Sequence, residues 1–190
     1  MYRWRRSAAL LTAVVLISMA WPASLVPAGT AQPDVNQPLA APPGGPAQAW
    51  LVADMVSGAI LAGQDAYGAY APASTIKPLL AMVVLDQLRP DAAARANQSH
   101  AQVECSCAGL VAGQVYTVRQ LLDGLLLVSG NDAAVALAEG GGGTLDGFVG
   151  MMNRQAQAWG LKQTSFKNVT GLTEPGHQST ARELAVIAQH

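Results

Sequence analysis

A serine and a lysine three residues apart, Ser74 and Lys77, are the first side chains in this sequence that could do chemistry together. A serine hydroxyl is a weak nucleophile unless a base stands beside it. Residues three apart on a helix share a face, and burial lowers the pKa of a lysine toward the range where its amine acts as a base. A helix cap followed by a chance lysine would look the same. The catalytic interpretation gains support because no other Ser-x-x-Lys exists in the chain and Lys77 is the only lysine among residues 1–161.

A second group of polar residues, Ser129-Gly130-Asn131, follows the apolar run LDGLLLV and precedes another helical stretch. A serine hydroxyl in such a connection can relay a proton, and an asparagine amide can both donate and accept hydrogen bonds from a substrate. Taken alone, the same triplet is typical of a turn in which Asn131 caps the following helix.

The elements that must position these groups follow from periodicity. Residues 49–56 and 59–63 are apolar and β-prone around a Ser-Gly turn, which predicts two antiparallel strands. Residues 75–89 predict a buried helix, and because Pro78 is tolerated only in a first turn, that helix should begin near Thr75 and leave Ser74 at its mouth. Something is expected after His190, because two strands alone make a marginal sheet.

Four more helices are expected. One begins after a Thr117 cap with apolar residues at helical spacing, and a short one over 132–139 is ended by the glycines 140–143. Another spans 145–159 with Gly160 as its stop. Thr180 and Glu183 have the spacing of a capping box that opens the last helix.

Composition indicates a globular domain, and the N-terminal residues predict that it lies outside the cytoplasm. The chain has 190 residues, 51% hydrophobic and 12% charged, with a net charge of −1, which suits a globular domain and gives no basic patch for nucleic acid. Arg3, Arg5 and Arg6 precede an apolar stretch at 7–20 that is short for a membrane span, so 1–31 is predicted to be a signal peptide. An uncleaved N-terminal anchor is the alternative. The five prolines within 32–48 indicate a linker, and the folded domain should cover 49–190.

The two cysteines, Cys105 and Cys107, suggest a disulfide in an exported protein. Their spacing makes a tight ring, and pairing with a cysteine beyond the end of this sequence is also open. A metal site is not favoured, because His100 is the only other ligand nearby.

These residues resemble one family, the penicillin-binding D-alanyl-D-alanine carboxypeptidases, the low-molecular-weight branch of the serine penicillin-binding proteins. The resemblance covers about residues 49–190, with Trp159, Val169 and Glu183 replacing usual family residues. The matching positions are Ala71–Lys77, Ser129–Ala134, Phe148, Val149, Met152, Asn153, Ala156, Thr164, Phe166, Asn168, Gly171, Leu172 and Ser179–Arg182.

The resemblance implies a mixed α/β fold of the serine β-lactamase and penicillin-binding group, in which an antiparallel sheet packs against a helical cluster. It implies a Ser74 nucleophile, a Lys77 base, a Ser129 proton relay and a substrate-binding Asn131, with no cofactor and no metal. The expected substrate is a peptidoglycan stem peptide ending in D-Ala-D-Ala, and β-lactam antibiotics are the expected inhibitors. Contact with a membrane is expected only through the export signal or a C-terminal anchor beyond His190.

One departure from the family matters. The family has a third motif, Lys-Thr-Gly or similar, on a later strand, and no such triplet exists in this sequence. That strand supplies a cation for the substrate carboxylate and half of the oxyanion hole. We therefore expect the 190 residues to be the N-terminal part of a longer gene product that lacks its C-terminal strands here, and to be inactive alone.

Three other functions are compatible with parts of this sequence. A Ser-His-Asp hydrolase is poorly supported, because there is no Gly-x-Ser-x-Gly elbow and the three histidines, His100, His177 and His190, fall in polar or terminal segments expected at the surface. A serine β-lactamase would share the first two motifs, but no Glu-x-x-Leu-Asn-like segment is present. A truncated, non-catalytic product that binds wall peptides, or a pseudogene product, is the third possibility.

Overall fold

The computed structural model describes residues 45–190, so the expected signal peptide at 1–31 and the linker up to residue 44 lie outside the described residues. Within that part of the chain, no helix combines the length and the apolar character needed to cross a membrane. The elements are β1 (Trp50–Ala53), β2 (Ile60–Gln64), the 3₁₀ turn η1 (Ala73–Ile76), α1 (Lys77–Gln87), β3 (Ala93–Arg95), α2 (Gln98–Ala101), β4 (Val115–Thr117), α3 (Val118–Leu127), α4 (Asn131–Gly142), α5 (Leu145–Ala158) and α6 (Ala181–Gln189).

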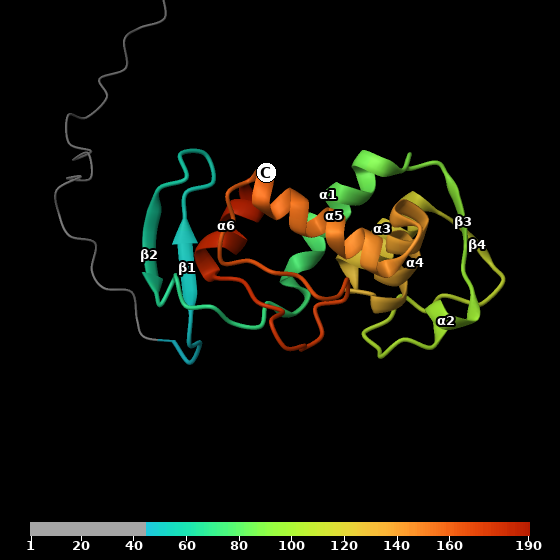
Figure 1. The fold of residues 1–190 in the computed structure, drawn as a ribbon, viewed down its shortest axis with the longest axis horizontal. Coiled ribbons are helices and arrows are strands. Elements are labelled where there is room, and N and C mark those ends of the chain that lie inside the picture. Colours follow the sequence, from blue (N-terminus) through green and yellow to red (C-terminus); the bar gives the residue numbers. More distant parts are fainter. Residues whose placement is uncertain (1–44) are drawn as a thin grey trace, which may run out of the picture. The chain divides into compact units, whose positions relative to one another are not determined.

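The first two strands form the predicted antiparallel hairpin. Trp50 pairs with Gln64 and Val52 with Ala62, and the register shifts just before Ala53. The turn is organised by Asp54, whose carboxylate accepts hydrogen bonds from the backbone N–H and the hydroxyl of Ser57 at 2.6 and 2.7 Å. One strand of this hairpin, β1, packs against α6 (Figure 1).

The helices form a cluster around α1, which contacts α3, α4, α5 and α6 (Figure 1). The predicted Thr117 cap is present, and Gln120 completes a capping box with it. The α1 helix is buried along most of its length, as its apolar sequence predicts. The largest fully buried side chains are Ile76, Leu79, Leu80, Val84, Val118, Leu121, Leu125, Leu137, Phe148, Met152, Phe166 and Ile187.

A second hairpin was not foreseen from the sequence. Strands β3 and β4 pair antiparallel, Ala93 with Thr117 and Arg95 with Val115, and the short helix α2 lies between them in the chain. Each strand is only three residues long. β3 reads Ala-Ala-Arg and has no β-prone residue, and β4 reads Val-Tyr-Thr, which is β-prone but too short to stand out as a strand. The simple order of two strands followed only by helices was therefore wrong.

The prediction that the glycines 140–143 end the helix begun at 132 was also wrong, because α4 continues to Gly142 and only Gly143 is its C-cap. Packing explains the continuation. A Cβ atom on Gly142 would lie 2.8 Å from the Phe148 side chain, and one on Gly141 would lie 3.2 Å from the Phe148 ring. Glycine costs an isolated helix about 1 kcal/mol per residue, but here it lets α5 lie close against α4.

The start of α6 corrects a third expectation. Thr180 caps the helix by accepting a hydrogen bond from the Glu183 backbone N–H at 3.1 Å, as predicted. The Glu183 carboxylate does not complete the capping box. It accepts instead from the Gln163 backbone N–H at 3.0 Å and from the Thr164 hydroxyl at 2.5 Å, so it ties α6 to the segment after α5.

Candidate active site

Ser74 lies within the 3₁₀ turn η1, which leads directly into α1. The helix begins at Lys77 with Pro78 in its first turn, where the missing proline N–H leaves no bond unmade. Ala73, immediately before the serine, has a φ of 51°, in the left-handed region that alanine rarely adopts. The sequence prediction that Ser74 stands at the mouth of this helix agrees with that placement.

Lys77 is the centre of the site. Its side chain is 2% exposed, and its Nζ lies within hydrogen-bonding distance of the hydroxyl of Ser74, at 3.2 Å, and of the hydroxyl of Ser129, at 3.0 Å. It also donates to the side-chain oxygen of Asn131 at 2.8 Å and to the backbone carbonyl of Ser129. All four residues singled out from the two sequence motifs therefore meet at one nitrogen atom.

The environment of this amine favours its neutral form. Burial lowers the pKa of Lys77 from 10.5 to about 8, and the negative charge of Asp132 offsets part of that effect. A neutral amine beside a serine hydroxyl is a base that can accept the hydroxyl proton.

Ser129 and Asn131 come from the connection between α3 and α4. Ser129 has a φ of 59° and is, after Ala73, a second residue of the site in the left-handed region. The N-cap of α4 is Gly130, not Asn131. Asn131 is the first residue of α4 and is 4% exposed. Its Oδ1 accepts from Lys77, and its Nδ2 donates to the Glu104 carbonyl at 2.8 Å. One amide N–H therefore remains for any contact with a substrate.

Sequence reasoning missed Asp132, which it treated only as the start of a helix. Asp132 is 1% exposed, and its carboxylate accepts from the backbone N–H groups of Ala108, Gly109 and Leu110 at 2.8 to 2.9 Å and from its neighbour Ala133. Burial raises the pKa of Asp132, but these backbone hydrogen bonds outweigh it and hold the pKa below its usual value. An acid directly after Ser-Gly-Asn was the signal available in the sequence.

The loop that Asp132 holds carries both cysteines. Cys105 and Cys107 are joined by a disulfide. Between them, the Ser106 carbonyl accepts from the Asn131 backbone N–H at 2.6 Å, and its hydroxyl donates to the Val128 carbonyl at 3.1 Å. The disulfide loop is thus fastened to the connection that presents Ser129 and Asn131 to the lysine.

The expectation that the histidines are surface residues was wrong for two of the three. His100 is 4% exposed and its Nε2 lies 2.8 Å from a Glu139 carboxylate oxygen, while His177 is 3% exposed and its Nδ1 accepts from the Lys167 backbone N–H at 3.0 Å. Both are buried because they close loops onto the helical cluster. His190 is exposed and stacks on Trp159.

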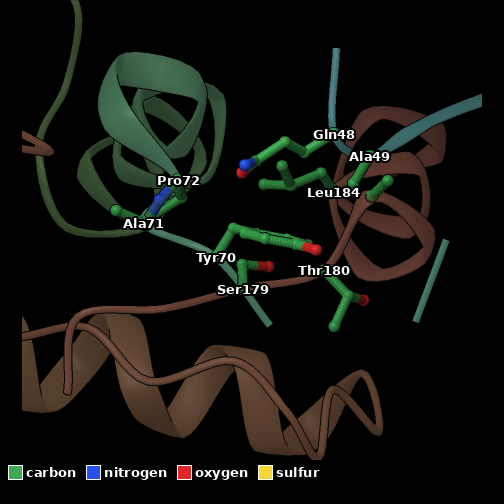
Figure 2. A pocket seen from close by; sticks show the side chains of 9 residues that line it. Gln48, Ala49, Tyr70, Ala71, Pro72, Ser179, Thr180 and Leu184 are labelled. Carbon is green, nitrogen blue, oxygen red and sulfur yellow. The ribbon is translucent and has the colours of Figure 1, made fainter. Parts of the chain in front are cut away.

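A cavity of about 260 Å³ borders the segment that leads into Ser74. Figure 2 shows Tyr70, Ala71 and Pro72 lining it together with Gln48 and Leu184. None of the four residues gathered at the lysine lines this cavity, which is formed instead where Tyr70 pairs with Ser179 through two backbone hydrogen bonds of 2.9 Å. It lies beside the candidate site, not within it.

A serine at a helix start, a buried lysine within hydrogen-bonding distance and a second serine on that lysine are the parts that a serine acyl-transferring enzyme with a lysine base requires. Comparison with known proteins agrees. A family model described as D-alanyl-D-alanine carboxypeptidase matches residues 36–190. The chain belongs to this family.

Individual proteins of this family are similar to the chain in sequence and in structure. The chain is 51% identical over 147 residues to the D-alanyl-D-alanine carboxypeptidase DacB2 of Mycobacterium tuberculosis, covering 76% of this chain and 50% of that protein. It is 35% identical over 154 residues to DacC of Escherichia coli, covering 75% of this chain and 38% of that protein. The chain thus spans half or less of the length of these relatives.

The fold comparison confirms the predicted fold group. The crystal structure of a D-alanyl-D-alanine carboxypeptidase from Mycobacterium tuberculosis superposes with a TM-score of 0.73 at 50% identity, covering 77% of this chain and 56% of that one. Penicillin binding protein 5 from Haemophilus influenzae gives a TM-score of 0.75 at 33% identity, covering 80% of this chain and 46% of that one.

Proposed function

We propose that the protein is a serine-type D-alanyl-D-alanine carboxypeptidase that removes the terminal D-alanine from peptidoglycan stem peptides through an acyl-enzyme on Ser74. The observation that carries the proposal is the single buried amine of Lys77, hydrogen-bonded at once to the Ser74 hydroxyl, the Ser129 hydroxyl and the Asn131 amide. Membership in the family supports the choice of substrate.

In the proposed reaction, the neutral amine of Lys77 takes the Ser74 proton while the serine oxygen attacks the carbonyl carbon of the penultimate D-alanine. The Ser74 backbone N–H stabilises the developing oxyanion as one of two donors. Collapse of the tetrahedral intermediate breaks the peptide bond and leaves the shortened peptide as an ester on Ser74. The proton held by Lys77 passes to the departing nitrogen.

Ser129 is the proposed relay for that proton, because its hydroxyl lies 3.0 Å from the lysine amine. A water molecule then hydrolyses the ester, which returns Ser74 to its starting state and releases the shortened peptide. Asn131 holds the amine of Lys77 in place, and its remaining amide N–H is available to orient the peptide.

The proposed setting is the cell envelope. Peptidoglycan stem peptides are found outside the cytoplasm, and the expected signal peptide at 1–31 would deliver the domain there. Penicillins are proposed inhibitors that acylate the same serine.

A fluorescent penicillin tests this function. The complete protein should be labelled, Ser74→Ala should not be, and Thr75→Ala, which removes the neighbouring hydroxyl, should label normally. D-alanine release from a synthetic peptide ending in D-Ala-D-Ala should follow the same pattern. Labelling that persists in Ser74→Ala would exclude this serine as the nucleophile, and rapid turnover of the penicillin without D-alanine release would indicate a β-lactamase instead.

A further inference from the structure

A closed loop packs against the backbone that carries the candidate nucleophile. Ser165 and Gln178 pair through two backbone hydrogen bonds of 2.9 Å and so close the segment between them. His177 braces the base of the loop from within, because its ring nitrogen accepts from the Lys167 N–H. The tip of this loop, residues 168–172, lies against Ala73 and Ser74.

The contact at the tip is made by Gly171, which has a φ of +89°. A Cβ atom at this position would lie 2.2 Å from the carbonyl oxygen of Ala73 and 2.8 Å from the backbone nitrogen of Ser74. Real Cβ contacts do not occur at such distances, so only glycine fits against this peptide group. The peptide group it touches is the one whose N–H belongs to Ser74.

Asn168 holds the glycine in that position. Its Oδ1 accepts from the Gly171 N–H at 2.9 Å and from the N–H and hydroxyl of Thr170 at 3.2 and 3.1 Å. Its Nδ2 donates to the Leu172 carbonyl at 2.9 Å and to a Glu174 carboxylate oxygen at 3.1 Å. One side chain therefore fixes the whole tip of the loop.

The peptide group under this loop is itself unusual. Ala73 is left-handed, a conformation that costs a non-glycine residue free energy and persists only where the surroundings enforce it. The peptide group belongs to the turn η1, and Gly171 packs against it from outside that turn. The loop tip therefore fixes the direction of the Ser74 N–H.

We infer that Gly171, fixed by Asn168, is a positioning residue that orients the Ser74 backbone N–H toward the oxyanion of the acylation step. The inference rests on the proposed function and adds to it two residues from a loop distant in sequence. A donor held in place for an oxyanion is worth about 10²–10³ in rate, and displacement of a positioned group by about 1 Å costs up to about 100-fold.

Gly171→Ala in the complete protein tests the inference, with Gly160→Ala as its matched control. Both glycines have a positive φ, +89° and +73°, but a Cβ on Gly160 would meet nothing within 4 Å. Acylation by a fluorescent penicillin is followed as a time course, which separates the rate constant from the fraction of protein that reacts. Gly171→Ala should lower the acylation rate constant at saturating penicillin at least about tenfold, and Gly160→Ala should leave it within about twofold of wild type.

A purely structural role would instead lower the reactive fraction and the melting temperature of Gly171→Ala and leave its rate constant at the wild-type value. That result would overturn the inference. If wild type is itself not acylated at Ser74, the proposed function fails and this inference with it. If wild type is acylated and Gly171→Ala reacts at the wild-type rate, only the inference fails.

Asn168 variants decide the matter if Gly171→Ala does not fold. Asn168→Ala removes the side-chain bonds from Asn168 to Thr170, Gly171 and Leu172 and should slow acylation, whereas Asn168→Asp keeps the acceptor for the Gly171 N–H and should restore part of the rate. Equal rates for wild type, Asn168→Ala and Asn168→Asp would contradict the proposed coupling.

Discussion

The pKa of Lys77 makes the proposed acylation step steeply dependent on pH. The amine is the base only when neutral, and with a pKa of about 8 roughly 10% of it is neutral at pH 7 and half at pH 8. The rate constant for acylation by penicillin should therefore rise about fivefold between pH 7 and pH 8 and level off by about pH 9. Stopped-flow or gel-based labelling across pH 6.5–9.5 measures the profile.

Lys77→Arg tests the same reasoning by substitution. Arginine keeps the positive charge but does not lose its proton at these pH values, so the variant should acylate at least about 100-fold more slowly and show no rise near pH 8. Lys162→Arg, an exposed lysine of the same chain, is the control and should retain the wild-type rate and profile. A flat wild-type profile, or a Lys77→Arg rate within a few-fold of wild type, would mean that the lysine is only an electrostatic support.

The same pKa shift should be visible in stability. In the unfolded chain the lysine has its ordinary pKa of 10.5, so between about pH 8 and pH 10.5 the unfolded state binds a proton that the folded state has released. The contribution of Lys77 to the free energy of unfolding therefore rises with pH across this window, by up to about 3 kcal/mol. Chemical denaturation of wild type and Lys77→Met at several pH values isolates it, because the substitution removes this pH dependence.

Three further predictions concern residues that support the site without taking part in the proposed reaction. Asp132→Asn should lower the melting temperature and shift the acylation profile to lower pH, because loss of the carboxylate charge lets the pKa of Lys77 fall further. Opening the disulfide with dithiothreitol should slow acylation about fivefold, the value of one hydrogen bond of about 1 kcal/mol, since the Ser106 carbonyl within the closed loop accepts from the Asn131 backbone N–H. In denaturant titrations, Gly140→Ala should stabilise the protein by up to about 1 kcal/mol because a Cβ fits there at 3.5 Å, whereas Gly142→Ala should destabilise it by about 1–3 kcal/mol.

The sequence was sufficient for the parts of the site that are local. The spacing of Ser74 and Lys77 determines that they share one helical face, and the structure places their side chains 3.2 Å apart. The apolar periodicity after Thr117 likewise predicted α3 and its cap. In both cases the information lies within a few residues, where helix geometry alone decides which side chains meet.

Contacts between residues of different segments could not be predicted from these local patterns. Glu183 has the spacing of a capping-box partner, yet its carboxylate binds Gln163 and Thr164, because folding brings their donors to it. His100 and His177 occur in polar segments but are buried. His100 is hydrogen-bonded to Glu139, which is distant in sequence, and His177 is hydrogen-bonded to Lys167 in the opposite arm of its own loop. Local pattern does not specify such competing partners.

Two left-handed residues, Ala73 and Ser129, show how the long-range packing bears on the chemistry. Each precedes a helix that supplies a side chain to the site, and each is held from outside its own segment. Gly171 packs against the peptide group between Ala73 and Ser74, and the Ser129 carbonyl and hydroxyl are both hydrogen-bonded to the Lys77 amine. Strained backbone at a site persists only when its surroundings over-determine it. The loop that carries Gly171 and the buried amine of Lys77 are therefore what hold these two turns in the conformations that bring both serine hydroxyls to the same amine.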